Sequence, residues 1–208
     1  MNSEKEKIFI VGGAGYIGSV LCENLINEGY FVKCLDRFFF GKSSINHLLG
    51  NEKFSISVVD SRLLTEEDLV GADVVIDLSG LSNDPSCDLD QNLTEDINLN
   101  GGLNVFETSL LAGVKKYIYS SSCSIYGSSE ENVNTENSKP SPVSLYAESK
   151  FKLEEQILSK SKNSAIQSTI LRNATVFGLS NRMRFDLIIN IMTAHAYENN
   201  RIYILGGG

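Results

Sequence analysis

The chain has 208 residues, 42% of them hydrophobic, and carries a formal net charge of −8 at pH 7, a length that allows one α/β domain and part of a second. The acidic balance disfavours nucleic acid as a partner, and since no apolar run approaches the ~18 residues of a membrane span, no membrane association is expected. Four scattered cysteines and two histidines lack zinc-ligand spacing, so no metal is expected, and reduced thiols without a signal peptide predict a cytoplasmic protein.

Apolar runs alternate with helical patterns along the chain. Strands are predicted at residues 7–11, 31–35, 54–59, 74–78, 116–120 and 168–172. Helices are predicted at 16–28, 65–69, 94–111, 144–159 and 185–199, with Gly29 and Gly113 as stop signals. Because the strands are short and continuously apolar, they are typical of a parallel sheet covered on both faces. The sequence therefore predicts an α/β fold, a Rossmann-type doubly wound parallel sheet, with ligands at the carboxyl ends of the strands.

The first predicted strand runs directly into a glycine-rich turn. Gly12, Gly15 and Gly18 follow one another at three-residue spacing, between that strand and the first helix. The first glycine allows a tight turn, the second lets a ligand approach the backbone, and the third lets the helix lie against the strand. The amides at the start of the helix, including those of Tyr16 and Ile17, point at the turn, where a pyrophosphate fits. A dinucleotide site is therefore predicted here.

Residues at the ends of the next strands specify the cofactor. Asp36 follows Gly18 by 18 residues, close to the ~20 expected of a carboxylate that binds the adenosine ribose and repels a 2′-phosphate. This favours NAD over NADP, although Asp36 is also a plausible strand-end turn residue and the neighbouring Arg37 could pair with a 2′-phosphate. Asp60 could reach the adenine amino group or cap a helix. Gly80 fits a position where backbone and cofactor come close.

Tyr146 and Lys150 are four residues apart in a predicted helix, so their side chains share one face. An ammonium group ~5 Å from a phenol, at an effective dielectric of ~20, favours the phenolate by roughly 3 kcal/mol, or about two pKa units. Such a pair can act as general base on an alcohol and general acid on the returning alkoxide. The spacing alone also suits two solvated residues. The serine run that ends at Ser122 favours catalysis, because it places a hydroxyl at the ligand-binding end of the sheet.

The glycine turn, Asp36, the stretch SSSCSIYG from Ser120 and the Tyr146/Lys150 pair together resemble the extended short-chain dehydrogenase/reductase family. Within that family the chain is similar to the nucleotide-sugar epimerase/dehydratase branch, of the UDP-glucose 4-epimerase type. The resemblance implies that Tyr146 is the acid/base, that Lys150 lowers its pKa and binds the nicotinamide ribose, and that Ser122 polarises the sugar hydroxyl.

The resemblance extends to further positions. It implies that Asn98 lies beside the active site, against the alternative of a helix-surface residue. Substrate contacts are expected at Ser82, after the fourth strand, and at Thr175, Arg182 and Arg184, after the sixth. The two arginines could meet a diphosphate, or the segment could serve only to dock the next helix. Relatives of this branch often dimerise through the helices that hold Asn98 and Tyr146, so a homodimer is expected.

These observations predict an NAD-dependent nucleotide-sugar epimerase that oxidises a sugar hydroxyl transiently. Cys123 and Ser124 stand where the family's 4,6-dehydratases have an acidic pair, so dehydration by that route is disfavoured. Two alternatives stay open: a nucleotide-sugar dehydrogenase or ketoreductase on the same site, and a non-catalytic dinucleotide-binding module or fragment.

The domain organisation is predicted from the end of the chain. Residues 1–178 form the NAD-binding Rossmann domain, in which residues 128–142 are a polar surface loop. Residues 179–208 begin a substrate-binding lobe, with a last strand at 201–205 before Gly206, Gly207 and Gly208. Since folds of this kind continue into a larger lobe, we expect that the C-terminal substrate lobe is largely missing through truncation.

Overall fold

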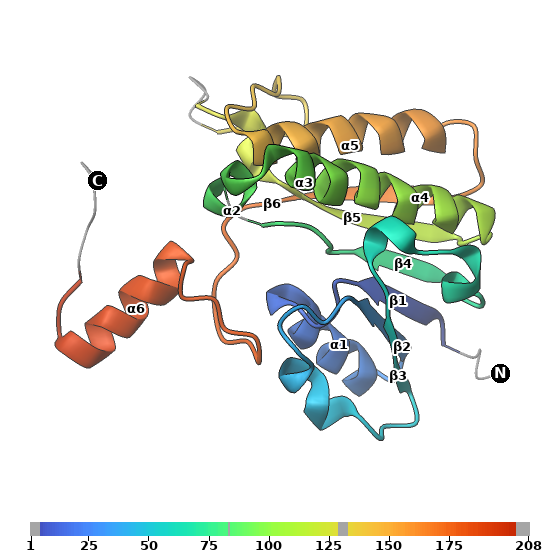
Figure 1. Cartoon of the computed structure of the whole chain (residues 1–208), viewed down its shortest axis with the longest axis horizontal. Helices are drawn as coiled ribbons and strands as arrows, with labels where there is room; N and C mark the ends of the chain where they lie inside the picture. Colours follow the sequence, from blue (N-terminus) through green and yellow to red (C-terminus); the bar gives the residue numbers. More distant parts are fainter. Residues whose placement is uncertain (1–4, 83, 129–132, 203–208) are drawn as a thin grey trace.

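In a computed structural model, which describes residues 5–82, 84–128 and 133–202, six parallel strands form one sheet in the order β3-β2-β1-β4-β5-β6 (Figure 1). The strands are β1 Lys7–Val11, β2 Phe31–Asp36, β3 Phe54–Val58, β4 Val74–Asp77, β5 Lys116–Ser122 and β6 Gln167–Asn173. The predicted Rossmann-type doubly wound sheet is confirmed. Its strand order reverses between β1 and β4, the point at which ligands bind in open α/β sheets.

Helices cover both faces of the sheet because the strands are apolar on both sides. The helices are α1 Tyr16–Asn27, α2 Asp84–Leu89, α3 Gln91–Glu95, α4 Gly102–Leu111, α5 Leu145–Ser161 and α6 Ile188–Asn199. Phe9 and Val11 of β1 point to the core under α4 and α5, whereas Ile8 and Ile10 point to the core under α1. In Figure 1, α6 lies apart from these layers, beyond the carboxyl ends of the strands.

The helix predicted at 94–111 is interrupted. It consists of α3, a π-helical turn Asp96–Gly101 and then α4. Two glycines allow this segment to pack tightly: a Cβ on Gly101 would lie 2.8 Å from Ser61 Oγ, and one on Gly102 would overlap Leu153 of α5. Sequence reasoning missed the interruption, because helical backbone continues on both sides of it and both its ends, Asp96 and Gly101, have right-handed helical angles. Single π-turns of this kind occur frequently at functional sites.

Other boundaries differ in smaller ways. The helix predicted at 65–69 is a 3-10 helix, Glu66–Leu69, and sequence reasoning missed α2 and the 3-10 helix Ser43–Leu48. Gly29 and Gly113 do end helices, with φ of +88° and +71°. A strand was predicted at 201–205, but Arg201 and Ile202 are not in a strand, and residues 203–205 lie outside the described residues. Positions 129–132 of the predicted loop also lie outside them.

Among the described residues, no helix is long and apolar enough to cross a membrane.

Candidate active site

The glycine turn joins β1 to α1, and two of its three glycines are required by the protein's own packing. Gly12 has φ +78°, and its Cβ would lie 3.0 Å from the carbonyl group of Leu78. A Cβ on Gly18 would lie 2.5 Å from the carbonyl oxygen of Gly12. Gly15 is the N-cap residue of α1, where a Cβ would meet Gly12 O at 3.2 Å. A side chain at Gly15 would therefore crowd the turn, although less than one at Gly18.

The first turn of α1 is uncharged and leaves the positive end of the helix dipole facing the turn. It begins with Tyr16 and Ile17, and the amide of Ser19 already bonds to the carbonyl of Gly15. The Tyr16 hydroxyl donates to the carbonyl of Gly178 at 2.6 Å. The predicted cofactor turn therefore touches the segment between β6 and α6, for which substrate contacts are predicted.

Asp36 lies directly beside the glycine turn. Its carboxylate accepts a hydrogen bond from the Ala14 amide at 3.0 Å and another from the Phe38 amide at 2.7 Å. Phe38 has φ +54°, an uncommon conformation that the second bond helps to hold. Asp36 therefore does act as a strand-end turn residue, and its carboxylate lies beside the glycine turn.

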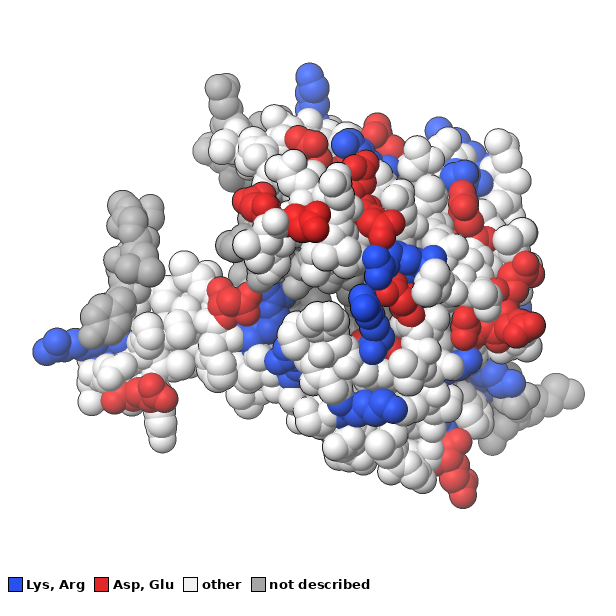
Figure 2. Space-filling model, viewed as in Figure 1, with Lys and Arg blue, Asp and Glu red and all other residues white. Residues whose placement is uncertain are grey.

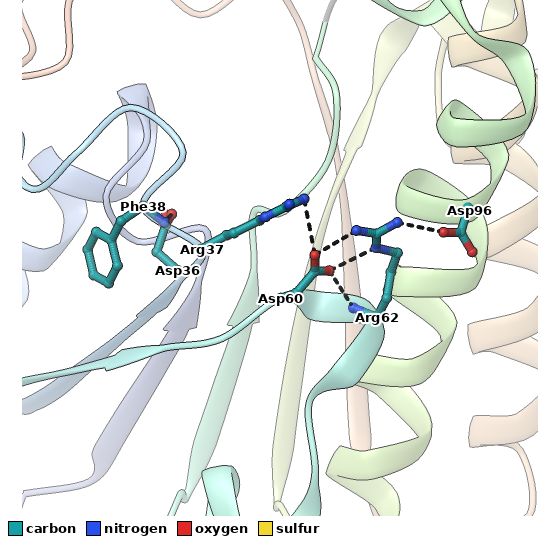
Figure 3. A network of polar contacts seen from close by, with 6 residues as sticks. All are labelled: Asp36, Arg37, Phe38, Asp60, Arg62 and Asp96. Atoms are coloured by element: carbon teal, nitrogen blue, oxygen red, sulfur yellow. Dashed lines mark hydrogen bonds and ion pairs between the residues drawn. The ribbon is translucent and has the colours of Figure 1, made fainter.

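A network of charges links the ends of β2 and β3 to the π-turn (Figure 3). Asp60 accepts bonds from the amide, Nε and Nη2 of Arg62, and Arg62 Nη1 contacts Asp96 at 2.7 Å. Hydrogen bonds from Arg62 lower the pKa of Asp60 to about 2. Arg37 extends toward Asp60, with Nη1 3.3 Å from its Oδ2. Asp60 therefore does cap a helix, and Arg37 is paired with it.

Ser122 is the last residue of β5 and the N-cap of the 3-10 helix Cys123–Tyr126. Its Oγ accepts from the Ser124 amide at 3.2 Å and from the Ser124 hydroxyl at 2.9 Å. Because a hydroxyl carries one proton and two lone pairs, both acceptor positions are used inside the protein. The Ser122 proton is then the part of this hydroxyl that can be donated to a ligand.

Tyr146 and Lys150 lie together near the start of α5, which Ser144 caps. The Lys150 Nζ is 5.8 Å from the centroid of the Tyr146 ring and donates to the carbonyl of Ser120 at 2.9 Å. Lys150 is only 6% exposed, and burial lowers the pKa of its ammonium group. This predicted pair therefore adjoins the serine run at the carboxyl end of β5.

Asn98 belongs to the π-turn and is buried, so the alternative of a helix-surface residue is wrong. Its Oδ1 accepts from the Leu81 amide at 2.7 Å, and its Nδ2 donates to the Leu81 carbonyl at 3.1 Å. Gly80 has φ +133°, and a Cβ there would lie 2.8 Å from Asn98 Oδ1 and 4.0 Å from Lys150 Nζ. The structure therefore brings Gly80, Asn98 and Lys150 together.

The predicted substrate residues are only partly brought together. Arg184 Nη1 donates to Ser82 Oγ at 2.7 Å, across 102 positions of sequence, and Arg184 also pairs with Asp186. Arg182 instead lies over the Phe40 ring, with its guanidinium carbon 4.0 Å from the centroid. Thr175 is exposed. Figure 2 shows basic and acidic side chains next to one another where α6 meets the rest of the molecule.

Asn190 in α6 is a residue that sequence reasoning missed. It is buried and accepts from the Gly178 amide at 3.0 Å, while its Nδ2 donates to the Tyr16 hydroxyl at 3.0 Å and to the Arg184 carbonyl at 2.9 Å. Ser180 adds a bond of 2.7 Å to the Tyr16 carbonyl. The sequence does carry a signal for it, because Asn190 is the one polar residue in the apolar run LIINIM at 187–192.

Three further charged groups near the site were also missed. Asp77, at the end of β4, is buried and accepts from Ser79 and Tyr117. Glu154, four residues after Lys150, is buried, bonds Ser121 and is held by Arg172 of β6, with Nη2 to Oε2 at 2.8 Å. A charge within an apolar strand, and a carboxylate on the buried face of a helix, were the signals.

With this geometry in place, comparison with known proteins identifies the family. A model of the NAD dependent epimerase/dehydratase family matches residues 8–208, so the chain belongs to that family. NAD is the cofactor by which this family is defined, in agreement with the prediction from Asp36.

Relatives within the family carry several different activities. A UDP-arabinose 4-epimerase of Arabidopsis thaliana is 30% identical over 82% of this chain and 43% of its own length. A UDP-glucuronic acid decarboxylase of Xenopus tropicalis is 24% identical over 99% of this chain and 49% of its own length. The chain thus spans about half the length of these curated relatives.

Solved structures show the same fold. A UDP-glucuronic acid 4-epimerase of Bacillus cereus, in complex with UDP-glucuronic acid and NAD, has a TM-score of 0.85 and 27% identity, covering 97% of this chain and 66% of that one. The NDP-hexosamine 5,6-dehydratase of tunicamycin biosynthesis has a TM-score of 0.85 and 27% identity, covering 98% of this chain and 65% of that one.

Proposed function

We propose that this protein is an NAD-dependent nucleotide-sugar epimerase in which Tyr146 is the acid and base. The observation that carries the proposal is the buried Lys150 ammonium group, 5.8 Å from the Tyr146 ring and bonded to the serine strand end. The charge of Lys150 favours the phenolate of Tyr146 and so makes it a base near neutral pH. The epimerase relatives among the comparisons support this choice within the family.

The residues present fit NAD. Gly15 adds no side chain at the N-terminus of α1, the uncharged start of α1 favours a pyrophosphate, and Asp36, beside the turn, could accept the hydroxyls of the adenosine ribose. When bound, NAD supplies a hydride acceptor for the sugar carbon and returns the hydride afterwards. Asp60 would lie on the adenine side of the cofactor and Gly80 on its nicotinamide side.

The chain's own residues supply the proton chemistry. Tyr146 Oη accepts the proton of the sugar hydroxyl and gives it back when the hydroxyl is restored. Ser122 donates its proton to the reacting oxygen, since its lone pairs are occupied by Ser124. Lys150 holds positive charge beside Tyr146 and reaches the nicotinamide ribose. Asn98 shapes the Gly80–Leu81 backbone against which the ring would lie.

The substrate is a nucleotide sugar whose diphosphate meets the segment between β6 and α6. Arg184 is bonded to Ser82 in the loop after β4, whereas Arg182 is stacked on Phe40. Arg184 would therefore contribute more to the diphosphate than Arg182. Thr175, exposed in the segment after β6, would contact the sugar. The homodimer, the two-part domain division and the cytoplasmic location stay predictions.

Replacement of Tyr146 tests the function. We expect Tyr146→Phe to lose at least ~100-fold in turnover of UDP-sugars, because the acid/base hydroxyl is gone, with NAD affinity unchanged by calorimetry. Tyr197→Phe is the matched control, since Tyr197 of α6 is 89% exposed and its loss leaves turnover unchanged. Wild-type turnover of Tyr146→Phe would end the proposal.

Absorbance of the reduced nicotinamide separates an epimerase from an oxidoreductase, and a binding measurement separates it from a dinucleotide-binding module. An epimerase interconverts the sugars without net reduction of added NAD. Steady accumulation of reduced nicotinamide would instead identify a nucleotide-sugar dehydrogenase. NAD binding without binding of any UDP-, GDP-, CDP- or dTDP-sugar would identify a dinucleotide-binding module.

A further inference from the structure

Asp77 is a buried carboxylate to which the proposed mechanism gives no part. It is the last residue of β4, 1% exposed, beside the point where the strand order reverses. It accepts from the Ser79 amide at 2.9 Å, the Ser79 hydroxyl at 2.6 Å and the Tyr117 hydroxyl at 3.0 Å. All three donors are neutral. Hydrogen bonds of this kind reduce the free energy cost of a buried charge but do not neutralise it.

Among the described residues, Lys150 is the buried cation that can balance Asp77. In the described part of the chain, the buried side chains that are charged in neutral water are Asp77, Lys150 and Glu154. Glu154 already has a cation, because the guanidinium of Arg172 approaches both of its oxygens, at 2.8 to 3.3 Å. Because Glu154 is paired with Arg172, the carboxylate of Asp77 and the ammonium of Lys150 are the two buried charges that still need an opposite charge.

Strand pairing places these two groups at one corner of the sheet. Asp77 of β4 is in register with Tyr119 of β5, and paired residues point their side chains to the same face. The Lys150 Nζ lies 4.8 Å from the centroid of the Tyr119 ring. The same Nζ is 4.0 Å from the position of a Cβ on Gly80, three residues after Asp77.

We propose that Asp77 is the buried counter-charge of Lys150, a positioning residue that keeps the lysine ammonium group protonated beside Tyr146. The pKa values of the two groups respond to one another: the carboxylate raises the pKa of Lys150, which burial lowers, and the ammonium lowers the pKa of Asp77, which burial raises. Cys87 of α2 and Glu154 of α5 also face Lys150. Glu154 already has Arg172 as its cation, so Asp77 is the carboxylate left to balance Lys150.

The consequence for catalysis rests on the proposed function. A buried lysine without a counter-charge loses its proton as the pH rises toward neutrality, because burial disfavours the charged form. Neutral Lys150 would no longer favour the phenolate of Tyr146. Asp77 would thus extend the working range of the site to higher pH while touching neither substrate nor cofactor.

Competitive acetylation with a trace of acetic anhydride measures the protonation of Lys150 directly, because only the neutral amine reacts. The rate at Lys150 is compared with that at Lys152, an exposed lysine of the same helix with 55% of its side chain accessible, by peptide mass spectrometry between pH 6 and 10. In Asp77→Asn we expect the Lys150/Lys152 ratio at pH 7 to rise ~10-fold, which corresponds to one pKa unit. A rise of less than about threefold, half a pKa unit, overturns the proposal.

Asp73→Asn is the matched control. Asp73 precedes the same strand at the opposite end of the sheet and pairs on the surface with Lys115, at 2.6 Å. It should leave the Lys150 ratio unchanged. The wild-type protein provides a test that needs no variant to fold: Lys150 must react at pH 7 at less than about a tenth of its limiting high-pH rate, and full reactivity at pH 7 overturns the proposal.

This readout is independent of turnover and so separates the two proposals. If Tyr146→Phe kept full activity while the Asp77→Asn ratio rose, the proposed function would fail and the Asp77–Lys150 pairing would stand. If Tyr146→Phe were inactive and the ratio did not move, the function would stand and the pairing would fail.

Discussion

The two halves of the candidate site are built differently. The half formed by β1, β2 and β3 uses backbone geometry and charges near the surface: the glycine turn, Asp36, and the network from Arg37 to Asp96. The half formed by β4, β5 and β6 uses charges inside the protein: Asp77, Lys150 and the Glu154–Arg172 pair.

The two halves differ in how far solvent screens their charges. Charges of the first half are screened by solvent, so each pair contributes little to stability, and the shape of the turn is what must be kept. In the second half, the buried carboxylate of Glu154 is balanced by Arg172, so the loss of Arg172 leaves a buried charge unmatched. Substitutions in the two halves should therefore fail in different ways.

The largest effect on stability is expected in the buried half. Arg172→Met leaves the carboxylate of Glu154 buried without a cation, and should lower the free energy of unfolding by about 3 kcal/mol in urea titrations. Lys160→Met is the control, since its pair with Glu107 is exposed and should contribute less than ~1 kcal/mol. Equal losses in the two variants would contradict the contrast between the halves.

A smaller effect, and of another kind, is expected in the turn. In Gly18→Ala the new Cβ would lie 2.5 Å from Gly12 O and 2.7 Å from Gly13 Cα, so backbone atoms of the turn must move. We expect NAD affinity to fall at least ~10-fold, about 1.4 kcal/mol, by calorimetry, with a native-like circular dichroism spectrum. Asn24→Ala, on the exposed part of α1, should bind NAD like the wild type. Unchanged NAD binding by Gly18→Ala would show that the turn is not the pyrophosphate site.

The smallest effect is expected at Asp60, and it depends on pH. The folded pKa of about 2 is below the ordinary value of 3.8, so the ionised carboxylate stabilises the fold above pH ~4 and this contribution disappears as the pH falls through 2. Asp60→Asn should therefore cost ~1 kcal/mol at pH 7, a figure reduced for solvent screening, and almost nothing near pH 2. A cost that stayed constant across that range, by urea titration at each pH, would show that the charge is not responsible.

How much could be predicted from the sequence follows the same division. The glycine turn, Asp36 and the Tyr146/Lys150 helix are local patterns, in which spacing along the chain fixes the geometry, and all six strands were found within two residues. The pairing of Arg184 with Ser82 and of Glu154 with Arg172 depends on which strands become neighbours, and no local pattern states that.

Two residues show what a local pattern leaves open. The helical pattern around Asn98 also allowed a surface position, and the π-turn directs the side chain inward to Leu81. Asp77 was passed over because a single carboxylate at the end of an apolar strand resembles a turn residue. Only the paired strand and the helix above it reveal that this carboxylate is buried with an ammonium group.

The π-turn at Asp96–Gly101 has a consequence for insertions and deletions in this part of the chain. A π-turn is equivalent to one extra residue inside an α-helix, and each residue of an α-helix rotates the chain by about 100°. Removing one residue from the turn would let α3 and α4 join as an uninterrupted α-helix. The register of everything on one side would then rotate by more than a quarter of a revolution, and Asn98 would leave the Gly80–Leu81 backbone. The extra residue thus sets the angle between the two helices' faces, which directs Asn98 to the Leu81 backbone while both flanking helices keep their buried faces.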